Sequence, residues 1–168
     1  GAAGGCAAGE TTEAAPPAPG ERGRADGYGT KFMKGATAIQ ELIEPMLTAQ
    51  PYPVKGLVAS GINLFHSIPN VERTKRALAN LDFILAIDVL PQDHIAWADV
   101  VLPEATYLER YDELWLCAHK TPYIALREPA IEPLYESRPG WWIARELGRR
   151  LDLADFFPWE DIEAYLNR

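Results

Sequence analysis

Two short apolar runs, at residues 54–60 and 83–89, have the nearly continuous hydrophobic character of strands buried in a parallel sheet. Between them, the apolar positions in residues 70–81 recur at intervals of three and four, which predicts an amphipathic helix. A strand, a helix and a strand in this order form one βαβ unit. The pattern therefore predicts an α/β fold, with a parallel sheet covered by helices on both faces.

Local signals refine the helices around this unit. Apolar spacing over residues 36–48 predicts a further helix, and Pro45 is expected to kink or end it. Asn70 stands where an N-cap belongs, and Glu72 follows in the first turn, where the helix dipole favours an acid. The helix before the second strand is therefore expected to begin at Asn70.

The second half of the chain is predicted to hold shorter elements. Trp141 and Trp142 are adjacent, so they cannot both face one core, and one of them is expected to meet another surface, such as that of a partner domain. The remaining predictions are a helical stretch at 92–98, a strand at 99–102 ended by Pro103, strand pieces at 115–118 and 123–127, and helices at 139–151 (with Pro139 as first helical residue) and 159–166.

The first 20 residues include 15 Ala, Gly or Pro, which offer little side chain to bury. Residues 1–35 are therefore predicted to be a poorly ordered linker or connector, and residues 36–168 to be the folded lobe. The chain starts without an initiator Met and without a signal peptide's charged and apolar regions. We expect it to be a processed or excised part of a larger subunit.

Composition excludes some classes of protein. Sixteen Lys and Arg against 24 Asp and Glu give a net charge of −8, which argues against a nucleic-acid partner. No apolar run approaches the roughly 18 residues of a membrane-spanning helix. The two cysteines, Cys6 and Cys117, lie far apart, so they predict neither a metal knuckle nor a disulfide framework.

The ends of the first two predicted strands carry the candidate binding residues, because a doubly wound sheet binds ligands beyond the carboxyl ends of its strands. Gly61 permits a tight turn, and the Asn63 amide suits a base edge or a phosphate. Asp88 ends the second strand, where dinucleotide folds place an acid for a ribose hydroxyl. Two plainer alternatives stay open: Asn63 closing a local Asx turn, and Asp88 simply solvated by water.

Familiar nucleotide and catalytic motifs are absent. Residues 60–66 read SGINLFH, with one glycine, and no phosphate-loop sequence occurs, so a nicotinamide dehydrogenase or a nucleotide hydrolase is disfavoured. A Cys117–His119 pair on one face of a strand is conceivable. An acidic stretch is compatible with a hard-cation site, but Arg110 within it favours ion pairing. Its acids are Glu104, Glu109, Asp112 and Glu113, and the two other scattered histidines are His66 and His94.

The segment LDFILAIDVLPQDHIAWADVVLPEATYLERYD, residues 81–112, resembles a stretch of the molybdopterin oxidoreductases of the dimethyl-sulfoxide-reductase superfamily. Two segments, TYLERYD at residues 106–112 and LREPAIEPLYESRPGWWIARELG at residues 126–148, are most similar to polysulfide and thiosulfate reductase catalytic subunits. The matching positions are Asp88, Ala96, residues 98–103 and Glu109–Arg110, together with the upstream element Gly61, Asn63, Ser67 and Pro69–Asn70.

The resemblance implies a Rossmann-like lobe that binds molybdopterin guanine dinucleotide. By the resemblance, Asn63 with Gly61 contacts the guanine dinucleotide, and Ile87 and Asp88 lie at its nucleotide end, with Asp88 facing guanine N–H groups. Arg110 becomes a candidate contact to phosphate or ribose. Some relatives also use an Asp on the closing helix, where this chain has Gly140. No metal ligand and no catalytic residue is assigned within the chain.

The implied whole is a catalytic subunit that reduces a sulfur compound of the polysulfide or thiosulfate type. The resemblance implies molybdenum or tungsten held by bis(molybdopterin guanine dinucleotide), and a 4Fe–4S cluster in a preceding part of the subunit. Expected partners are the subunit's other domains, an iron–sulfur electron-transfer subunit, a membrane anchor subunit and a small sulfur substrate, in the periplasm or facing it. The alternatives are a non-catalytic scaffold subunit of a respiratory complex and an independent small nucleotide-binding protein.

Overall fold

The computed structural model describes residues 39–167 apart from 113–114, 118–119 and 122, so the predicted connector at 1–35 lies outside the described residues. The chain divides into two compact units, one with the described residues up to Leu57 and Leu64–Phe83, the other with Val58–Asn63 and Ile84 onward. In chain order the elements are η1 (Ile39–Leu42), α1 (Ile43–Thr48), β1 (Gly56–Ser60), α2 (Leu64–Ser67), α3 (Val71–Leu78), β2 (Phe83–Asp88), η2 (Asp93–Trp97), β3 (Val100–Pro103), β4 (Trp115–Cys117), β5 (Tyr123–Ala125), α4 (Gly140–Arg150), η3 (Ala154–Phe156) and α5 (Ile162–Leu166), where η marks a 3₁₀ turn.

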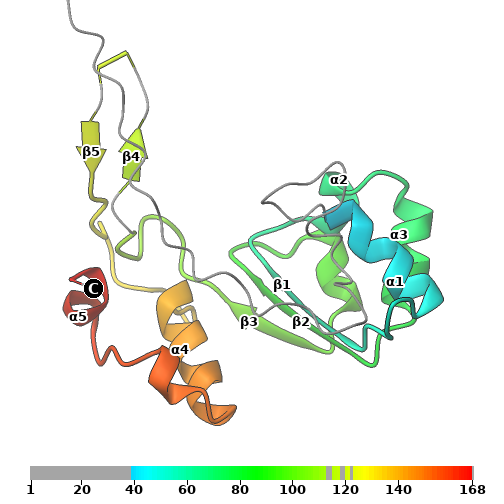
Figure 1. The fold of residues 1–168 in the computed structure, drawn as a ribbon. Helices are drawn as coiled ribbons and strands as arrows, with labels where there is room; N and C mark the ends of the chain where they lie inside the picture. Colours follow the sequence, from blue (N-terminus) through cyan, green and yellow to red (C-terminus); the bar gives the residue numbers. More distant parts are fainter. Residues whose placement is uncertain (1–38, 113–114, 118–119, 122, 168) are drawn as a thin grey trace, which may run out of the picture. The chain divides into compact units, whose positions relative to one another are not determined.

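The first unit is held together by the helices α1 and α3, which lie against each other (Figure 1). The predicted N-cap is confirmed: the Asn70 side chain accepts a hydrogen bond from the Arg73 N–H at 3.1 Å. The buried residues Thr74, Ala77 and Leu78 follow the helical spacing that the sequence predicts. Arg73 also pairs with Glu44, so a charged contact ties α3 to α1.

Pro45 does not end the helix, which continues to Thr48, so that part of the prediction is wrong. The α-helix begins only at Ile43, after a 3₁₀ turn, and continues to Thr48. Pro45 therefore lies in the first turn of α1, where a missing N–H removes no hydrogen bond within the helix. The break in regular helix occurs before the proline, between η1 and α1.

The sheet has the strand order β1-β2-β3. Strands β2 and β3 run parallel as predicted, with Leu85 opposite Val100 and Asp88 opposite Pro103. Five consecutive residues of the central strand, Ile84 through Asp88, are buried. In β1 only Ala59 is buried, so the prediction of a buried strand holds for β2 and is wrong for β1. An edge strand has a neighbour on one side only, which explains the difference.

The second unit is built on contacts between β2 and α4. Leu85, Ile87 and Ile143 are buried together, and Trp142 and Leu147 pack against them. Pro139 is the N-cap of α4, with an extended ψ of 145°, rather than its first helical residue as predicted. The core therefore positions the carboxyl end of β2 directly.

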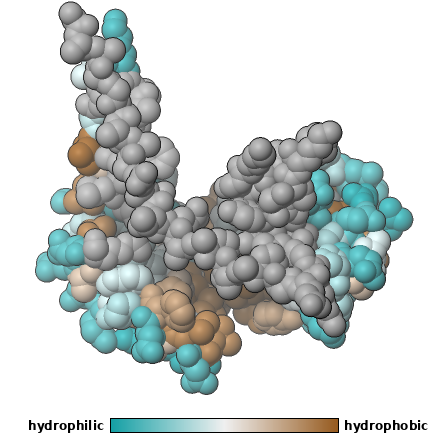
Figure 2. All heavy atoms as spheres, viewed as in Figure 1, coloured by the Kyte–Doolittle hydropathy of each residue, from teal (hydrophilic) through white to brown (hydrophobic). Residues whose placement is uncertain are grey.

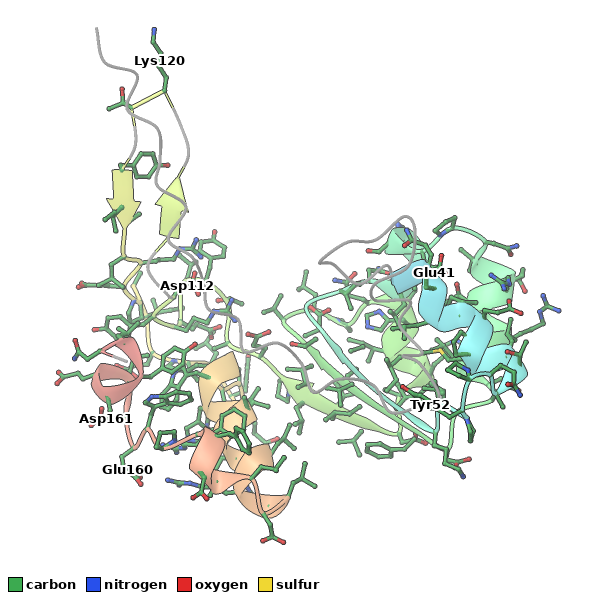
Figure 3. The ribbon with its side chains drawn as sticks, in the orientation of Figure 1. Glu41, Tyr52, Asp112, Lys120, Glu160 and Asp161 are labelled. Carbon is green, nitrogen blue, oxygen red and sulfur yellow. The ribbon has the colours of Figure 1, made fainter. Side chains whose placement is uncertain are left out.

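The two adjacent tryptophans divide between two surfaces of the same chain. Trp142 packs on the core, whereas Trp141 stacks on Tyr165 with 5.8 Å between ring centroids. One surface that Trp141 meets is thus that of α5, and a contact with a partner domain stays a prediction. Helix α5 starts later than predicted because Asp161, labelled in Figure 3, caps it by accepting from the Ala164 N–H at 2.8 Å.

A hairpin of β4 and β5 confirms a strand in each of the pieces predicted at 115–118 and 123–127, although β5 already ends at Ala125. The strands are antiparallel, and Figure 1 shows them extending as a narrow pair. At the foot of the hairpin Asp112, labelled in Figure 3, donates its N–H to the Arg127 carbonyl at 3.2 Å and pairs with the Arg127 guanidinium at 2.6 Å. His119 lies outside the described residues, so the suggested Cys117–His119 pair stays a prediction.

The face of the molecule in Figure 2 has hydrophilic and hydrophobic areas. Figure 2 shows a hydrophilic surface over the outer side of α1 and α3, and hydrophobic side chains near the carboxyl end of α4. Leu151 is 66% exposed there and Phe156 is 71% exposed. Within the described part of the chain, no helix has both the length and the apolar character needed to cross a bilayer.

Substitution Ile143→Ala is expected to lower the free energy of unfolding by about 2–5 kcal/mol, because it opens a cavity in the core beneath β2. Leu151→Ala, at the exposed end of the same helix, is the matched control and should cost less than about 0.5 kcal/mol. Chemical denaturation of the three proteins measures both values. Equal losses for the two variants would contradict the assignment of this core.

Candidate functional site

Gly61 directly follows β1 and has a φ of 60°, a conformation that glycine accepts readily. Its N–H donates to the Ile87 carbonyl at 3.0 Å, which joins the ends of β1 and β2. A Cβ built on Gly61 would meet no atom within 4 Å. The turn therefore favours glycine at position 61 and leaves open space beside the strand ends. It also brings Gly61 and Ile87 together.

Asp88 ends β2 as a buried acid, with 7% of its surface exposed. Its Oδ1 accepts hydrogen bonds from the N–H groups of Val89 at 2.7 Å and Leu90 at 3.3 Å. The alternative of a strand-end acid solvated by water is therefore wrong. The carboxylate shapes the turn that leaves the sheet, and its other oxygen faces Gln92.

Gln92 connects the two predicted site residues Asn63 and Asp88. Asn63 Nδ2 donates to Gln92 Oε1 at 2.6 Å, and Gln92 Nε2 donates to Asp88 Oδ2 at 3.4 Å. Asn63 thus makes a contact across 29 positions of sequence, beyond the reach of the Asx turn considered above. We call these three side chains the amide relay.

Gln92 was not singled out by the sequence analysis. The one signal available in the sequence is the position of Gln92, four residues after Asp88. In the structure Gln92 is the N-cap of η2 and has an extended backbone. That spacing does not reveal a contact with Asn63, because it depends on how β1 and β2 align. The relay is a product of the tertiary structure.

The end of β3 carries a second polar group, centred on Glu104. The Glu104 N–H donates to the Asp88 carbonyl at 3.0 Å, so the two strand ends are bonded directly. Its carboxylate pairs with Arg110, which also bonds the Ala105 carbonyl at 3.0 Å and Asp112 at 2.9 Å. Burial raises the pKa of Glu104, against the opposing effect of Arg110.

Gly140 makes room for the Glu104 carboxylate. A Cβ on Gly140 would lie 2.7 Å from Glu104 Oε1, closer than real side chains approach. The resemblance predicts an Asp on the closing helix in some relatives. At that position this chain has Gly140, and the acid beside it is Glu104, which directly follows β3. Arg110 lies at this end of the sheet between two acids, and its contact to the cofactor stays a prediction.

Glu109 serves the loop rather than an ion pair. Only 6% of it is exposed, and its oxygens accept from the N–H groups of Leu134 and Thr106, each at 2.7 Å. The bond from Leu134 and then those from Thr106 lower the pKa of Glu109. The ion-paired interpretation of the acidic stretch holds for Glu104 and Asp112 but is wrong for Glu109. Glu113 lies outside the described residues, and those described contain no cluster of His, Cys, Asp or Glu able to hold a metal.

Comparison with known proteins identifies the family of the chain. A sequence profile described as "Molybdopterin oxidoreductase" matches residues 12–150. The chain belongs to the molybdopterin oxidoreductase family. The recognition of this family from the segments around Asn63 and Asp88 is confirmed.

Several relatives place the chain within this molybdopterin oxidoreductase family. It is 36% identical over 129 residues to the thiosulfate reductase molybdopterin-containing subunit of Salmonella typhimurium, covering 77% of this chain and 17% of that protein. It is 29% identical over 146 residues to acetylene hydratase of Syntrophotalea acetylenica, covering 83% and 20%. The two relatives therefore bear the names of enzymes that catalyse different reactions.

A solved structure supports the α/β fold. Acetylene hydratase from Pelobacter acetylenicus matches with a TM-score of 0.63 and 27% identity, over 76% of this chain and 17% of that chain. The chain spans no more than about a fifth of the length of the relatives just described. The activity of a whole subunit is therefore a matter for proposal.

His94 lies close to the relay as a buried and unpartnered side chain. It is 1% exposed, and neither ring nitrogen has a hydrogen-bond partner among the described residues. Burial lowers the pKa of His94, although the carboxylates of Asp88 and Asp93 act in the opposite direction. The neutral ring is therefore the form that the fold accommodates.

Acidification is expected to destabilise the protein through His94. Because the pKa of His94 in the folded state lies below the ordinary pKa of histidine, the unfolded chain takes up the proton first, and stability falls as the pH drops below about 6.5. Thermal unfolding at about pH 7.5 and about pH 5.5 measures the effect. His94→Leu should lose less stability on acidification than the wild type, with the exposed His66→Leu as control. An unchanged pH response in His94→Leu would refute this role.

Proposed function

We propose that this chain forms the lobe of a molybdopterin oxidoreductase that holds the guanine dinucleotide end of the cofactor. The observation that carries the proposal is the amide relay at the carboxyl ends of β1 and β2, beside the open turn at Gly61. Ligands of parallel α/β sheets bind at this edge. The family supplies the class of cofactor, and the strand ends supply the polar groups to hold its nucleotide.

The residues at this edge fit a guanine nucleotide. Guanine offers N–H donors at N1 and N2, and the relay residues Asn63 and Asp88 carry oxygens that accept such donors. Gly61 lets a flat ligand approach the backbone, since no atom lies within 4 Å of the place for its Cβ. The set of groups is suited to a nucleobase.

The mechanism assigned to this lobe is binding and orientation. When bound, the pterin-held molybdenum or tungsten supplies the redox chemistry. Asn63 and Asp88 fix the distant nucleotide end, and Arg110 is a candidate contact to its phosphate or ribose. Burial of β2 keeps these groups rigid, because the core residues Leu85 and Ile87 anchor the strand that carries Asp88. Such anchoring limits how far the cofactor's reactive end can move.

The proposed reaction of the whole subunit is reduction of a sulfur compound of the polysulfide or thiosulfate type. Its support is the 36% identity to the thiosulfate reductase subunit, over 77% of the chain. The proposal includes a bis(molybdopterin guanine dinucleotide) cofactor and a 4Fe–4S cluster in another part of the subunit. It also includes an iron–sulfur partner, a membrane anchor subunit and a periplasmic or periplasm-facing location.

Cofactor analysis of the full-length protein tests this proposal. We expect molybdenum or tungsten in the purified subunit, and release of GMP when the pterin is hydrolysed. Metal-free and pterin-free protein would instead support the non-catalytic scaffold. Guanine nucleotide without metal or pterin would support an independent nucleotide-binding protein.

Asn63→Ala is expected to reduce the cofactor retained by the full-length protein about tenfold, because it removes one hydrogen-bonding group from the nucleotide and breaks the relay. Asn167→Ala, at an exposed position after α5, is the matched control and should leave the cofactor content unchanged. Metal content and GMP released per protein measure both. Full retention in Asn63→Ala would refute the role of Asn63.

A further inference from the structure

Tyr135 is an exposed aromatic residue held in an unfavourable backbone conformation. Its φ is 57°, in the left-handed region that bulky residues rarely occupy, and 97% of its surface is exposed. Turns that need this conformation favour Gly, Asn or Asp. A ring with so little of its surface covered gains almost nothing from packing within its own chain. The cost of placing a tyrosine here therefore points to a contact outside the chain.

The turn that carries Tyr135 is fixed by the fold around it. The Leu134 carbonyl accepts from the Ser137 N–H at 3.2 Å and from Ser137 Oγ at 2.7 Å, which closes a four-residue turn with Tyr135 and Glu136 at its centre. The Leu134 N–H donates to the buried carboxylate of Glu109 at 2.7 Å. A surface that is ordered before binding loses less conformational entropy on association. The fold thus presents Tyr135 in one prepared position.

Further exposed apolar side chains lie beside this turn. The Ile131 N–H donates to the Leu108 carbonyl at 3.1 Å, which makes these two residues neighbours, and Leu134 begins the turn itself. All three are exposed. We call Leu108, Ile131, Leu134 and Tyr135 the Tyr135 surface. An aromatic anchor with apolar neighbours is typical of the centre of a protein–protein interface.

Unpaired acids flank the Tyr135 surface. Glu128, Glu132 and Glu136 are exposed, and none of them forms an ion pair or a hydrogen bond with another described residue. Arg138, a cation close by in sequence, lies over the Trp142 ring, 5.7 Å from its centroid. An apolar centre with free carboxylates around it is complementary to a surface rich in Lys and Arg.

We propose that the Tyr135 surface docks a separate protein, which presents an electropositive face with a pocket for the tyrosine ring. A second copy of this chain is a poor occupant, because its net charge is −8 and like acids would meet across a symmetric contact. Flanking charges mainly accelerate the encounter of molecules that diffuse separately, which a domain of the same polypeptide does not need. The inference does not depend on the proposed nucleotide binding.

Photo-crosslinking identifies the occupant. The photoreactive residue p-benzoylphenylalanine is placed at position 135 of the full-length subunit, in the cells that naturally produce it, and the crosslinked peptides are sequenced by mass spectrometry after irradiation. We expect a peptide of a second kind of polypeptide, from a region with more Lys and Arg than Asp and Glu.

Binding of that polypeptide to the full-length subunit then tests the anchor. Tyr135→Asn removes the ring but keeps a residue that readily adopts a positive φ. We expect its affinity to be about tenfold or more weaker, with a melting temperature that is unchanged or higher. Phe156→Ala, at an exposed aromatic residue of η3, is the matched control and should bind as the wild type does.

The flanking acids have a separate kinetic signature. The double variant Glu132→Gln and Glu136→Gln should lower the association rate constant about threefold or more at low salt, and it should weaken the dependence of that rate on salt. The dissociation rate constant should change little. Glu41→Gln, at an exposed acid of η1, is the matched control.

Several results would overturn the inference. They are a crosslink only within the same polypeptide or to a second copy of it, no crosslink at all, and unchanged affinity in Tyr135→Asn. A lowered melting temperature in Tyr135→Asn also counts against it, because the ring would then act within the fold. None of these measurements involves GMP or the metal, so their failure leaves the proposed function to its own tests.

Discussion

Burial of the central strand β2 is the constraint on which the rest of the second unit depends. Leu85 and Ile87 pack against Ile143 of α4, while parallel pairing aligns β2 with β3. A strand held this way has one register, since a shift by one residue would turn its side chains to the other face. Its carboxyl end, with Asp88, is therefore fixed in space before any ligand binds.

A series of hydrogen bonds connects that fixed end to other polar side chains. Asp88 accepts from the turn that follows it and from Gln92, and Gln92 in turn accepts from Asn63. Each bond restricts the next side chain, because donors and acceptors must alternate. The buried carboxylate of Asp88 thereby sets the order of donors and acceptors along the relay.

Much of this protein was readable from its sequence because the signals were local. Apolar spacing and the Asn70 cap predicted α3, and the run at 83–89 predicted β2, since both depend on residues a few positions apart. Tertiary context overrode local signals elsewhere: Pro45 lies inside α1, β1 is mostly unburied, and Pro139 stands just before α4. Gln92 escaped notice because its partners lie on two different strand ends.

By itself, the sequence determined the family, the α/β class and the strand ends at Gly61, Asn63 and Asp88, because these rest on short motifs and on periodicity. Only the tertiary structure decided that Asp88 is buried, that Glu109 braces a loop and that Gln92 joins Asn63 to Asp88. The physical reason is that burial and hydrogen-bond partners depend on which segments meet. Residues 29 positions apart become neighbours only when β1 and β2 take their places in one sheet.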